Sequence, residues 1–201
     1  MTCAIVPAAG SSRRMGRPKL LLPFGDTTVA QALLASLRRA GVERIVVVIA
    51  PGDQALWSSV RAAGVEVAVN ERPERGMLSS ILTGLEALGG PAALAAAGEP
   101  ILVTPADLPA IDPATVRALI ATLERGGALL AVPTYLGRRG HPLAVASELA
   151  TEIAALDPAI GLRQLLERHP VTELAVDDRG VVADIDTPAD YESLGGGGAL
   201  G

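Results

Sequence analysis

Several features that are common in proteins are scarce in this chain, and each scarcity removes a class of function. The 201 residues include one cysteine, Cys3, so the chain cannot form an internal disulfide or a cysteine-based zinc cluster. Aromatic residues make up only 2%, and 17 basic residues stand against 22 acidic ones, which gives a net charge of −5. Nucleic acids and anionic membranes are therefore poor candidate partners, because they attract basic surfaces, and single strands attract aromatic ones.

Long hydrophobic runs are also missing. Unbroken aliphatic stretches such as residues 45–50 are far shorter than the roughly 20 residues that cross a bilayer. The N-terminus is first apolar and then basic at Arg13 and Arg14, which is the reverse of a secretory signal. We therefore expect a soluble, cytoplasmic protein.

Hydrophobic residues, in contrast, are abundant and make up 49% of the chain. That share is too high for a disordered chain, and the length favours one domain. We expect a single domain over residues 1–194. The glycine-rich end, residues 195–201, has no periodic apolar face and is expected to be a flexible tail.

The elements predicted along the chain alternate between strand and helix over its first two thirds. Apolar runs predict strands at 4–6, 44–50, 65–69, 101–104, 128–133, 143–146, 171–176 and 181–185. Helical spacing and capping residues predict helices at 29–40, 53–63, 77–88, 113–125, 148–155 and 162–168, and a last short one from Pro188. Such alternation predicts an α/β fold of three layers, α/β/α, with a mostly parallel twisted sheet. Ligands of these sheets bind beyond the carboxyl ends of the strands.

The loop after the first predicted strand, residues 8–19, contains Ala8, Ala9, Gly10, Ser12, Arg14 and Lys19. Its small residues allow main-chain N–H groups to approach an anion, and Arg14 and Lys19 add positive charge. Lys19 is the only lysine beside sixteen arginines, and a compact ammonium can reach between phosphates. The alternative is an ordinary glycine-containing turn, since neither a Rossmann nor a P-loop fingerprint is present.

Two aspartates follow two further predicted strands. Asp107 comes just after 101–104, and Asp186 just after 181–185. Mg²⁺ commonly binds one or two carboxylates together with substrate phosphates, so this pair predicts a metal site, although each aspartate alone could simply organise a turn. Asp184 faces the other side of the predicted strand and is the weaker candidate.

Two other segments carry polar groups. Ser79 and Ser80 lie in the first turn of the helix at 77–88, where they could contact a base edge or merely cap the helix. The turn 137–142 contains Arg139 and His141 and could hold an anionic acceptor, or be a solvated hairpin tip.

Together these motifs resemble the MobA-like NTP transferase superfamily, over roughly residues 5–191. The matching patterns are A-A-G-x-[SG]-x-R-M-G-x-x-K in 8–19, R-G-x-x-S-[SV]-x-x-x-G-L from Arg75, D-x-P at Asp107, D-x-D-T-P from Asp184, and G-H-P from Gly140. The resemblance is nearest to the molybdopterin cytidylyltransferase-like branch, and it implies a Rossmann-like nucleotidyltransferase fold.

The resemblance also implies roles for individual residues. Gly10, Ser12, Arg14 and Lys19 would hold the triphosphate, and Ala8 and Ala9 would lie against the base and sugar. Ser80, and more weakly Asn70 and Gly76, would contact the nucleobase. Asp107 and Asp186 would hold Mg²⁺ or Mn²⁺, and Arg139 and His141 would lie near a phosphorylated acceptor, a pterin in that branch.

The implied reaction is nucleotidyl transfer with release of pyrophosphate. An acceptor phosphate is mostly dianionic at neutral pH, so no general base is needed. The sequence indeed contains no credible His–Asp or Cys–His catalytic arrangement. Catalysis would then depend on positioning and charge neutralisation.

The nucleotide and the activity leave alternatives open. The methyl group of Ala9 narrows the base site and favours CTP, with GTP as the near alternative. A nucleotide-binding accessory protein of a molybdoenzyme would keep the loop but would not need both aspartates. A nicotinamide-dependent oxidoreductase would need a Rossmann fingerprint and an acidic residue such as Asp53 after the second strand. A sugar-phosphate nucleotidyltransferase would more often have G-T-R-L in the first loop.

Overall fold

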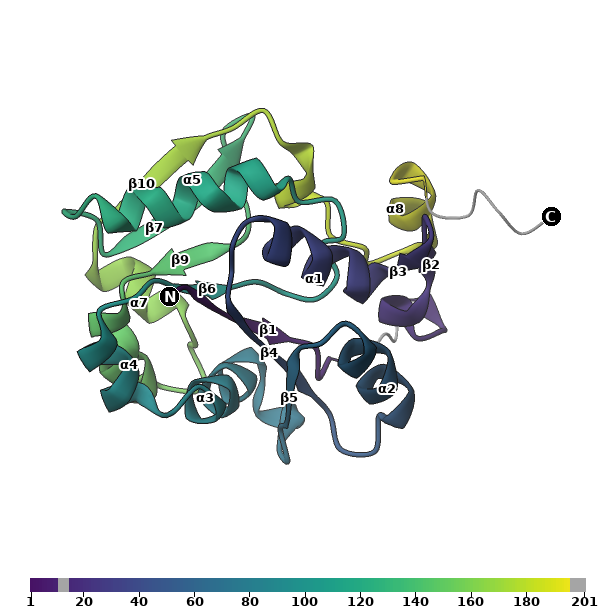
Figure 1. Ribbon diagram of the computed structural model, residues 1–201, viewed down its shortest axis with the longest axis horizontal. Coiled ribbons are helices and arrows are strands. Elements are labelled where there is room, and N and C mark those ends of the chain that lie inside the picture. The colour runs from purple at the N-terminus through teal and green to yellow at the C-terminus, as the bar shows by residue number, and fades with distance from the viewer. Residues whose placement is uncertain (11–14, 196–201) are drawn as a thin grey trace.

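A single twisted sheet organises the chain, as Figure 1 shows for the computed structural model, which describes residues 1–10 and 15–195. The strands are β1 Cys3–Pro7, β2 Pro23–Phe24, β3 Thr27–Thr28, β4 Arg44–Ile49, β5 Glu66–Val69, β6 Ile101–Val103, β7 Leu130–Tyr135, β8 Arg138–Arg139, β9 Leu143–Val145 and β10 Val171–Ala175. The helices are α1 Val29–Arg39, α2 Gln54–Ala62, α3 Met77–Ala87, α4 Pro91–Ala97, α5 Pro113–Glu124, α6 Ala150–Ala154, α7 Arg163–Arg168 and α8 Pro188–Ser193. Short 3₁₀ turns lie at Lys19–Leu21, Pro73–Arg75, Ser147–Leu149 and Arg179–Val182.

The order of the main sheet is β10-β7-β9-β6-β1-β4-β5, with β8 paired to β7. Strand β9 runs antiparallel to both of its neighbours, β6 and β7, and the other pairs along this order are parallel. The predicted mostly parallel sheet is therefore confirmed. Strands β2 and β3 form a separate small antiparallel pair.

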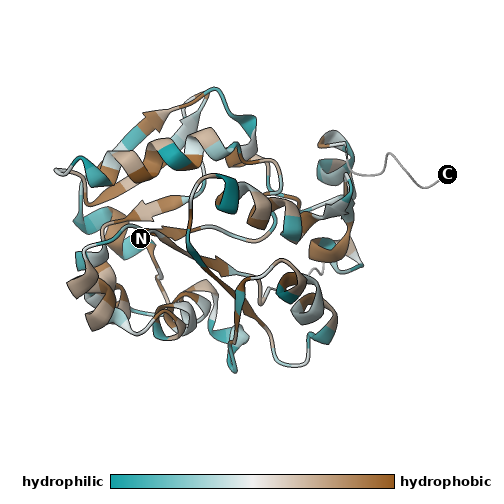
Figure 2. Cartoon of the chain, viewed as in Figure 1, coloured by the Kyte–Doolittle hydropathy of each residue, from teal (hydrophilic) through white to brown (hydrophobic). Residues whose placement is uncertain are grey.

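Alternation along the central strands explains the three layers. In β1, Ala4 and Val6 face the core beneath α1, α2 and α5, whereas Cys3 and Ile5 face the core beneath α3, α4 and α6. Because successive side chains of a strand point to opposite faces, a strand that is apolar at every position must be covered on both sides. In Figure 2 the central strands are mostly hydrophobic, whereas the helices on both sides carry hydrophobic and hydrophilic residues.

Most predicted elements are present, but the predicted strand at 181–185 is wrong. The segment instead forms the 3₁₀ turn Arg179–Val182 followed by irregular chain. Its backbone groups bond to loops: the N–H of His141 donates to the Val181 carbonyl at 2.8 Å, and the N–H of Ile185 donates to the Asp107 carbonyl at 3.0 Å. The β-forming composition of this segment is thus overridden by tertiary hydrogen bonds.

Two helical segments also differ from expectation. The helix predicted at 148–155 is divided into the turn Ser147–Leu149 and the short helix α6. Helix α4 was not predicted, although Pro91 at its first turn and the left-handed Gly98 at its end are the usual signals of a helix start and stop. The tail from residue 196 lies outside the described residues.

Within the described part of the chain, no single helix is long and apolar enough to cross a membrane. One bent pair, α3 with α4, meets the length and composition criteria when the two helices are taken together.

Helix α3 approaches β1 so closely that glycine is required at residue 84. A Cβ atom there would lie 2.4 Å from Cγ2 of Ile5, a fully buried side chain. We expect Gly84→Ala to lower the free energy of unfolding by about 1–3 kcal/mol, the usual cost of overpacking a core. Urea denaturation measures this cost, and it should fall clearly when Ile5 is also replaced by alanine. An equal cost in both backgrounds would contradict the steric explanation.

Cys3 provides a second test of the packing. Burial raises the pKa of the Cys3 thiol to about 11, although the positive charge of Arg44 acts to lower this pKa. Because the thiolate is the reactive form, a thiol reagent at pH 8 should modify the folded protein at least about 10²-fold more slowly than the same protein in guanidinium. Equal rates in the two states would show that β1 is not buried as described.

Candidate functional site

A pocket of about 300 Å³ opens at the carboxyl ends of the central strands. Its lining combines the first loop, the start of α3 and the loop after β6, and includes Ala8, Ala9, Gly10, Lys19, Gly76, Met77, Ser80 and Asp107. The position follows from the fold, because the carboxyl ends of parallel strands meet at one edge of the sheet. Of the thirteen residues for which the sequence predicts a role, this pocket brings seven together: Ala8, Ala9, Gly10, Lys19, Gly76, Ser80 and Asp107.

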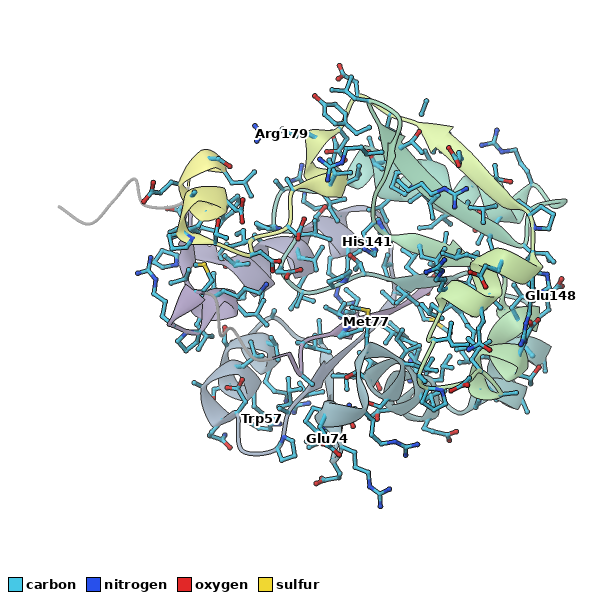
Figure 3. All side chains as sticks on the ribbon, turned by 180° about the vertical axis from the view of Figure 1, so that it is seen from behind. Trp57, Glu74, Met77, His141, Glu148 and Arg179 are labelled. Carbon is cyan, nitrogen blue, oxygen red and sulfur yellow. The ribbon has the colours of Figure 1, made fainter. Side chains whose placement is uncertain are left out.

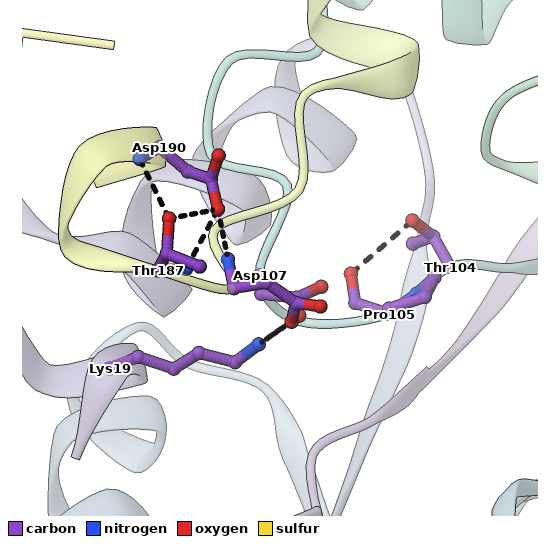
Figure 4. A network of polar contacts seen from close by, with 7 residues as sticks. Lys19, Thr104, Pro105, Asp107, Thr187 and Asp190 are labelled. Carbon is purple, nitrogen blue, oxygen red and sulfur yellow. Dashed lines mark hydrogen bonds and ion pairs between the residues drawn. The ribbon is translucent and has the colours of Figure 1, made fainter. Parts of the chain in front are cut away.

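Lys19 joins two acidic residues that are far away in the chain (Figure 4). Its ammonium Nζ lies 2.5 Å from Oδ2 of Asp107 and 3.0 Å from Oδ1 of Asp186. Burial alone lowers the pKa of Lys19, but the hydrogen bonds and charges of Asp107 and then Asp186 outweigh burial, so the pKa of Lys19 is raised overall. The lysine is therefore charged at neutral pH and neutralises part of a locally acidic cluster.

The loop that carries Asp107 continues the ladder of the sheet beyond β6. The N–H of Thr104 donates to the Ile5 carbonyl at 3.2 Å, and the N–H of Ala106 donates to the Pro7 carbonyl at 3.3 Å. Asp107 is thereby fixed beside the end of β1, where the first loop begins.

Asp186 is held by the cap of helix α8. A capping box joins Thr187 and Asp190, and Oδ2 of Asp190 accepts from the N–H of Thr187 at 2.7 Å and from the N–H of Asp186 at 3.2 Å. The hydrogen bond from the Thr187 hydroxyl, followed by those from the two backbone N–H groups, lowers the pKa of Asp190. The sequence correctly indicated the cap, but it did not show that this cap orients the backbone of Asp186.

Two carboxylates near each other could hold one divalent cation. Oδ1 of Asp107 is buried and has no hydrogen-bond partner among the described residues, so it could accept a hard cation. No group of three or more His, Cys, Asp or Glu that could hold a metal ion is found in the described part of the chain. Water or substrate oxygens would complete the coordination.

Asn70 holds the two serines at the start of α3 in position. Nδ2 of Asn70 donates to Oγ of Ser79 at 2.8 Å and to Oγ of Ser80 at 3.0 Å, and its Oδ1 accepts from the N–H of Arg72 at 2.9 Å. Asn70 is only 3% exposed and does not line the pocket, whereas Ser80 does. Gly76 has φ +86° and lets the chain turn into α3.

Arg139 and His141, the residues predicted to lie near the acceptor substrate, have different surroundings. His141 is largely buried, and burial lowers its pKa against the charges of Asp107 and Asp184. Its Nδ1 has no hydrogen-bond partner among the described residues, and Figure 3 places it in the middle of the face that also bears Met77. Arg139 instead pairs with Glu173 of β10, Nη2 to Oε1 at 2.7 Å, and does not line the pocket.

Two predicted residues, Ser12 and Arg14, lie outside the described residues. The structure adds Leu20, Pro73 and Met77 to the lining, none of which the sequence analysis singled out. Asp53, the residue that an oxidoreductase would need, accepts from the N–H of Leu56 at 3.1 Å and caps α2.

Known proteins share both the sequence pattern and the fold. The 2-C-methyl-D-erythritol 4-phosphate cytidylyltransferase of Salmonella paratyphi A is 31% identical over 203 residues, which cover 94% of this chain and 80% of that protein. The bifunctional protein GlmU of Xanthobacter autotrophicus is 34% identical over 142 residues, and the match spans only 31% of that longer protein.

Among solved structures, Rv0371c from Mycobacterium tuberculosis has a TM-score of 0.80 and 33% identity, with 96% of each chain covered. A complex of Rv0371c with manganese matches with a TM-score of 0.75 and 31% identity over 96% of this chain and 97% of that one. The sequence profile of a family described as "MobA-like NTP transferase domain" matches residues 4–173. The chain therefore belongs to the family of MobA-like NTP transferase domains.

Proposed function

We propose that this chain transfers CMP from CTP to a phosphorylated small molecule, such as molybdopterin or the molybdenum cofactor, and releases pyrophosphate. The observation that carries the proposal is the convergence of Lys19, Asp107 and Asp186 beside Gly10, in the loop after β1. A polyphosphate needs positive charge in its binding site, which Lys19 can supply. A divalent cation needs carboxylate oxygens, which Asp107 and Asp186 can supply.

The proposed reaction needs no proton transfer by a side chain. An oxygen of the acceptor phosphate forms a bond to the α-phosphorus of the NTP, and the bond from that phosphorus to the bridging oxygen breaks. The leaving pyrophosphate takes the electron pair. This chain's residues hold two polyanions in line and neutralise the growing charge, with Lys19 and Arg14 as the cationic side chains.

Asp107 and Asp186 are the residues that would hold the metal. A bound Mg²⁺ or Mn²⁺ supplies Lewis-acid stabilisation of phosphate oxygens. The manganese complex of Rv0371c, which is 31% identical, supports a divalent cation in this chain too.

In the described conformation Lys19 bridges the two aspartates and balances their charge. Lys19 also lines the first pocket, so its ammonium could contact phosphate oxygens of a nucleotide bound there.

The choice of nucleotide rests on the base side of the pocket. Ala9, whose methyl group narrows this side, lines the pocket, as do Ser80 and Met77. The 31% identical Salmonella relative is a cytidylyltransferase, which supports CTP. GTP remains the alternative, because one methyl group discriminates only modestly between bases.

The acceptor is less closely defined. The Archaeoglobus fulgidus molybdopterin-guanine dinucleotide biosynthesis protein A is 19% identical and shares the fold only, so the molybdopterin acceptor rests on the G-H-P resemblance around His141. The name of the Salmonella relative adds 2-C-methyl-D-erythritol 4-phosphate as a second acceptor to assay.

A melting-temperature panel with CTP, GTP, ATP and UTP plus Mg²⁺ tests nucleotide binding. A ligand at 100 times its Kd adds about 2.7 kcal/mol, which corresponds to roughly 5–10 °C for a chain of this size. We expect CTP to give the largest shift. A larger shift with GTP would reassign the donor, and no shift with any nucleotide would contradict the proposal.

Pyrophosphate release then tests transfer, with molybdopterin and 2-C-methyl-D-erythritol 4-phosphate as acceptors. We expect release only with donor, acceptor and Mg²⁺ together. Nucleotide binding without release with either acceptor would favour the accessory, non-transferring alternative.

Replacing Lys19 tests the charge cluster directly. We expect Lys19→Ala to lower turnover by about 10²-fold or more, the scale of losing one preorganised charge. Lys19→Arg should not restore the rate, because a planar guanidinium cannot replace a compact ammonium between Asp107 and Asp186. The control is Arg163→Ala, which removes a charge that is 79% exposed on α7. A wild-type rate from folded Lys19→Ala would remove Lys19 from the mechanism.

A further inference from the structure

A second pocket, of about 350 Å³, lies on the other side of the segment that carries Asp186. Its walls are the β7–β8 hairpin, the segment after the turn Arg179–Val182, and helix α8, and its lining residues are Tyr135, Leu136, Arg138, Arg179, Val182, Ala183, Asp184, Asp190, Ser193 and Leu194. Asp184 lines this pocket, whereas Asp186, two residues later, bonds to Lys19 of the first pocket. The short segment 184–186 therefore connects the second pocket to the contact with Lys19 at the first pocket.

Two arginines face this second pocket without a partner of opposite charge. Among the described residues, neither Arg138 nor Arg179 forms a hydrogen bond or an ion pair through its guanidinium, whereas the adjacent Arg139 is paired with Glu173. Figure 3 shows the Arg179 side chain projecting from its turn toward the space beside α8.

The acidic groups nearby are mostly engaged elsewhere. Asp178, next to Arg179, accepts from the N–H of Asp112 at 3.0 Å, the hydroxyl of Thr115 at 2.8 Å and the N–H of Gly180 at 2.9 Å. Oδ2 of Asp190 is taken by the cap of α8. Asp184 accepts no described hydrogen bond, so the lining holds two carboxylates beside its two guanidinium groups. The N–H groups of both guanidiniums still have no acceptor among the described residues, so they can donate to an anionic ligand.

The backbone segments that carry the two arginines pack closely. A Cβ on Gly140 would lie 2.3 Å from the Val181 carbonyl oxygen, and one on Gly180 would lie 2.2 Å from the Ala110 carbonyl oxygen. The hairpin that carries Arg138 therefore contacts the turn that carries Arg179, and the two exposed side chains start from neighbouring backbone.

The hairpin tip adds an apolar contact. Leu136 has φ 49°, a left-handed conformation that is unfavourable for a branched side chain, and it is 85% exposed. Leu136 and Gly137, both with positive φ, form the two-residue turn between the paired Tyr135 and Arg138, which accounts for this conformation. The exposed leucine side chain gives the second pocket an apolar part of its lining.

We propose that this second pocket binds the distal part of the acceptor, and that the acceptor carries, besides its reacting phosphate, a second anionic group for Arg138 and Arg179 and an apolar or ring portion for Leu136. The inference rests on the proposed function, because the reacting phosphate of such a molecule would lie beside Asp186 and Lys19, which the segment 184–186 connects to the second pocket. Arg138 and Arg179 then replace Arg139 as the cationic contacts to the acceptor.

Inorganic phosphate is the probe for the anion site. Side-chain Nε–H NMR signals of arginine are followed in the full chain while phosphate replaces chloride at constant ionic strength. We expect saturable shifts of the Arg138 and Arg179 signals, assigned with Arg138→Gln and Arg179→Gln, and about a tenfold weaker affinity in either variant. Arg163, on α7, is the matched control. Shifts no larger than those of Arg163 would overturn the proposal.

Steady-state kinetics then separate this inference from the proposed function. In the Arg138→Gln/Arg179→Gln variant we expect the KM for the acceptor to rise at least tenfold, with the KM for the nucleotide and the nucleotide-induced melting shift unchanged. Unchanged acceptor KM with continued pyrophosphate release would overturn the inference alone. Phosphate binding at both arginines without pyrophosphate release from any nucleotide would contradict the proposed function and, with it, the acceptor role of this pocket.

Discussion

The site depends on one ammonium group placed between two carboxylates. Lys19 is separated from Asp107 by 88 residues and from Asp186 by 167 residues, yet its Nζ contacts both. Two partly buried aspartates this close would repel each other, so a cation between them is a condition for the folded site. A lysine meets that condition in the described conformation, and a divalent cation with a nucleotide can meet it during the proposed reaction.

The sheet and helix α8 bring these groups together by different means. Asp107 is positioned by the end of the sheet, because the backbone N–H groups of the loop after β6 donate hydrogen bonds to the carbonyl groups of β1. Asp186 is not at a strand end, and the capping box of Thr187 and Asp190 holds its backbone instead. The result is a first pocket that contains Lys19 and Asp107 and a second pocket that contains Arg138 and Arg179.

The local signals in the sequence predicted most of the fold well. The capping box at Thr28 and the proline after Asp112 begin α1 and α5 as expected, because capping depends only on neighbouring residues. The segment 181–185 misled the prediction, since its valines and isoleucine favour a strand in isolation. Gly180 instead fits against the carbonyl of Ala110, a contact that no local pattern reveals.

For the site, the sequence by itself determined the chemical inventory: one lysine, two aspartates beyond apolar segments, and a loop of small residues at the end of the first strand. Only the tertiary structure decided which groups meet. It paired Lys19 with the aspartates, turned Arg139 toward Glu173, and left Arg138 and Arg179 facing one pocket. The physical reason is that residue type and spacing govern local conformation, whereas the partner of a charged side chain depends on which distant segments the packed sheet brings within a few ångströms.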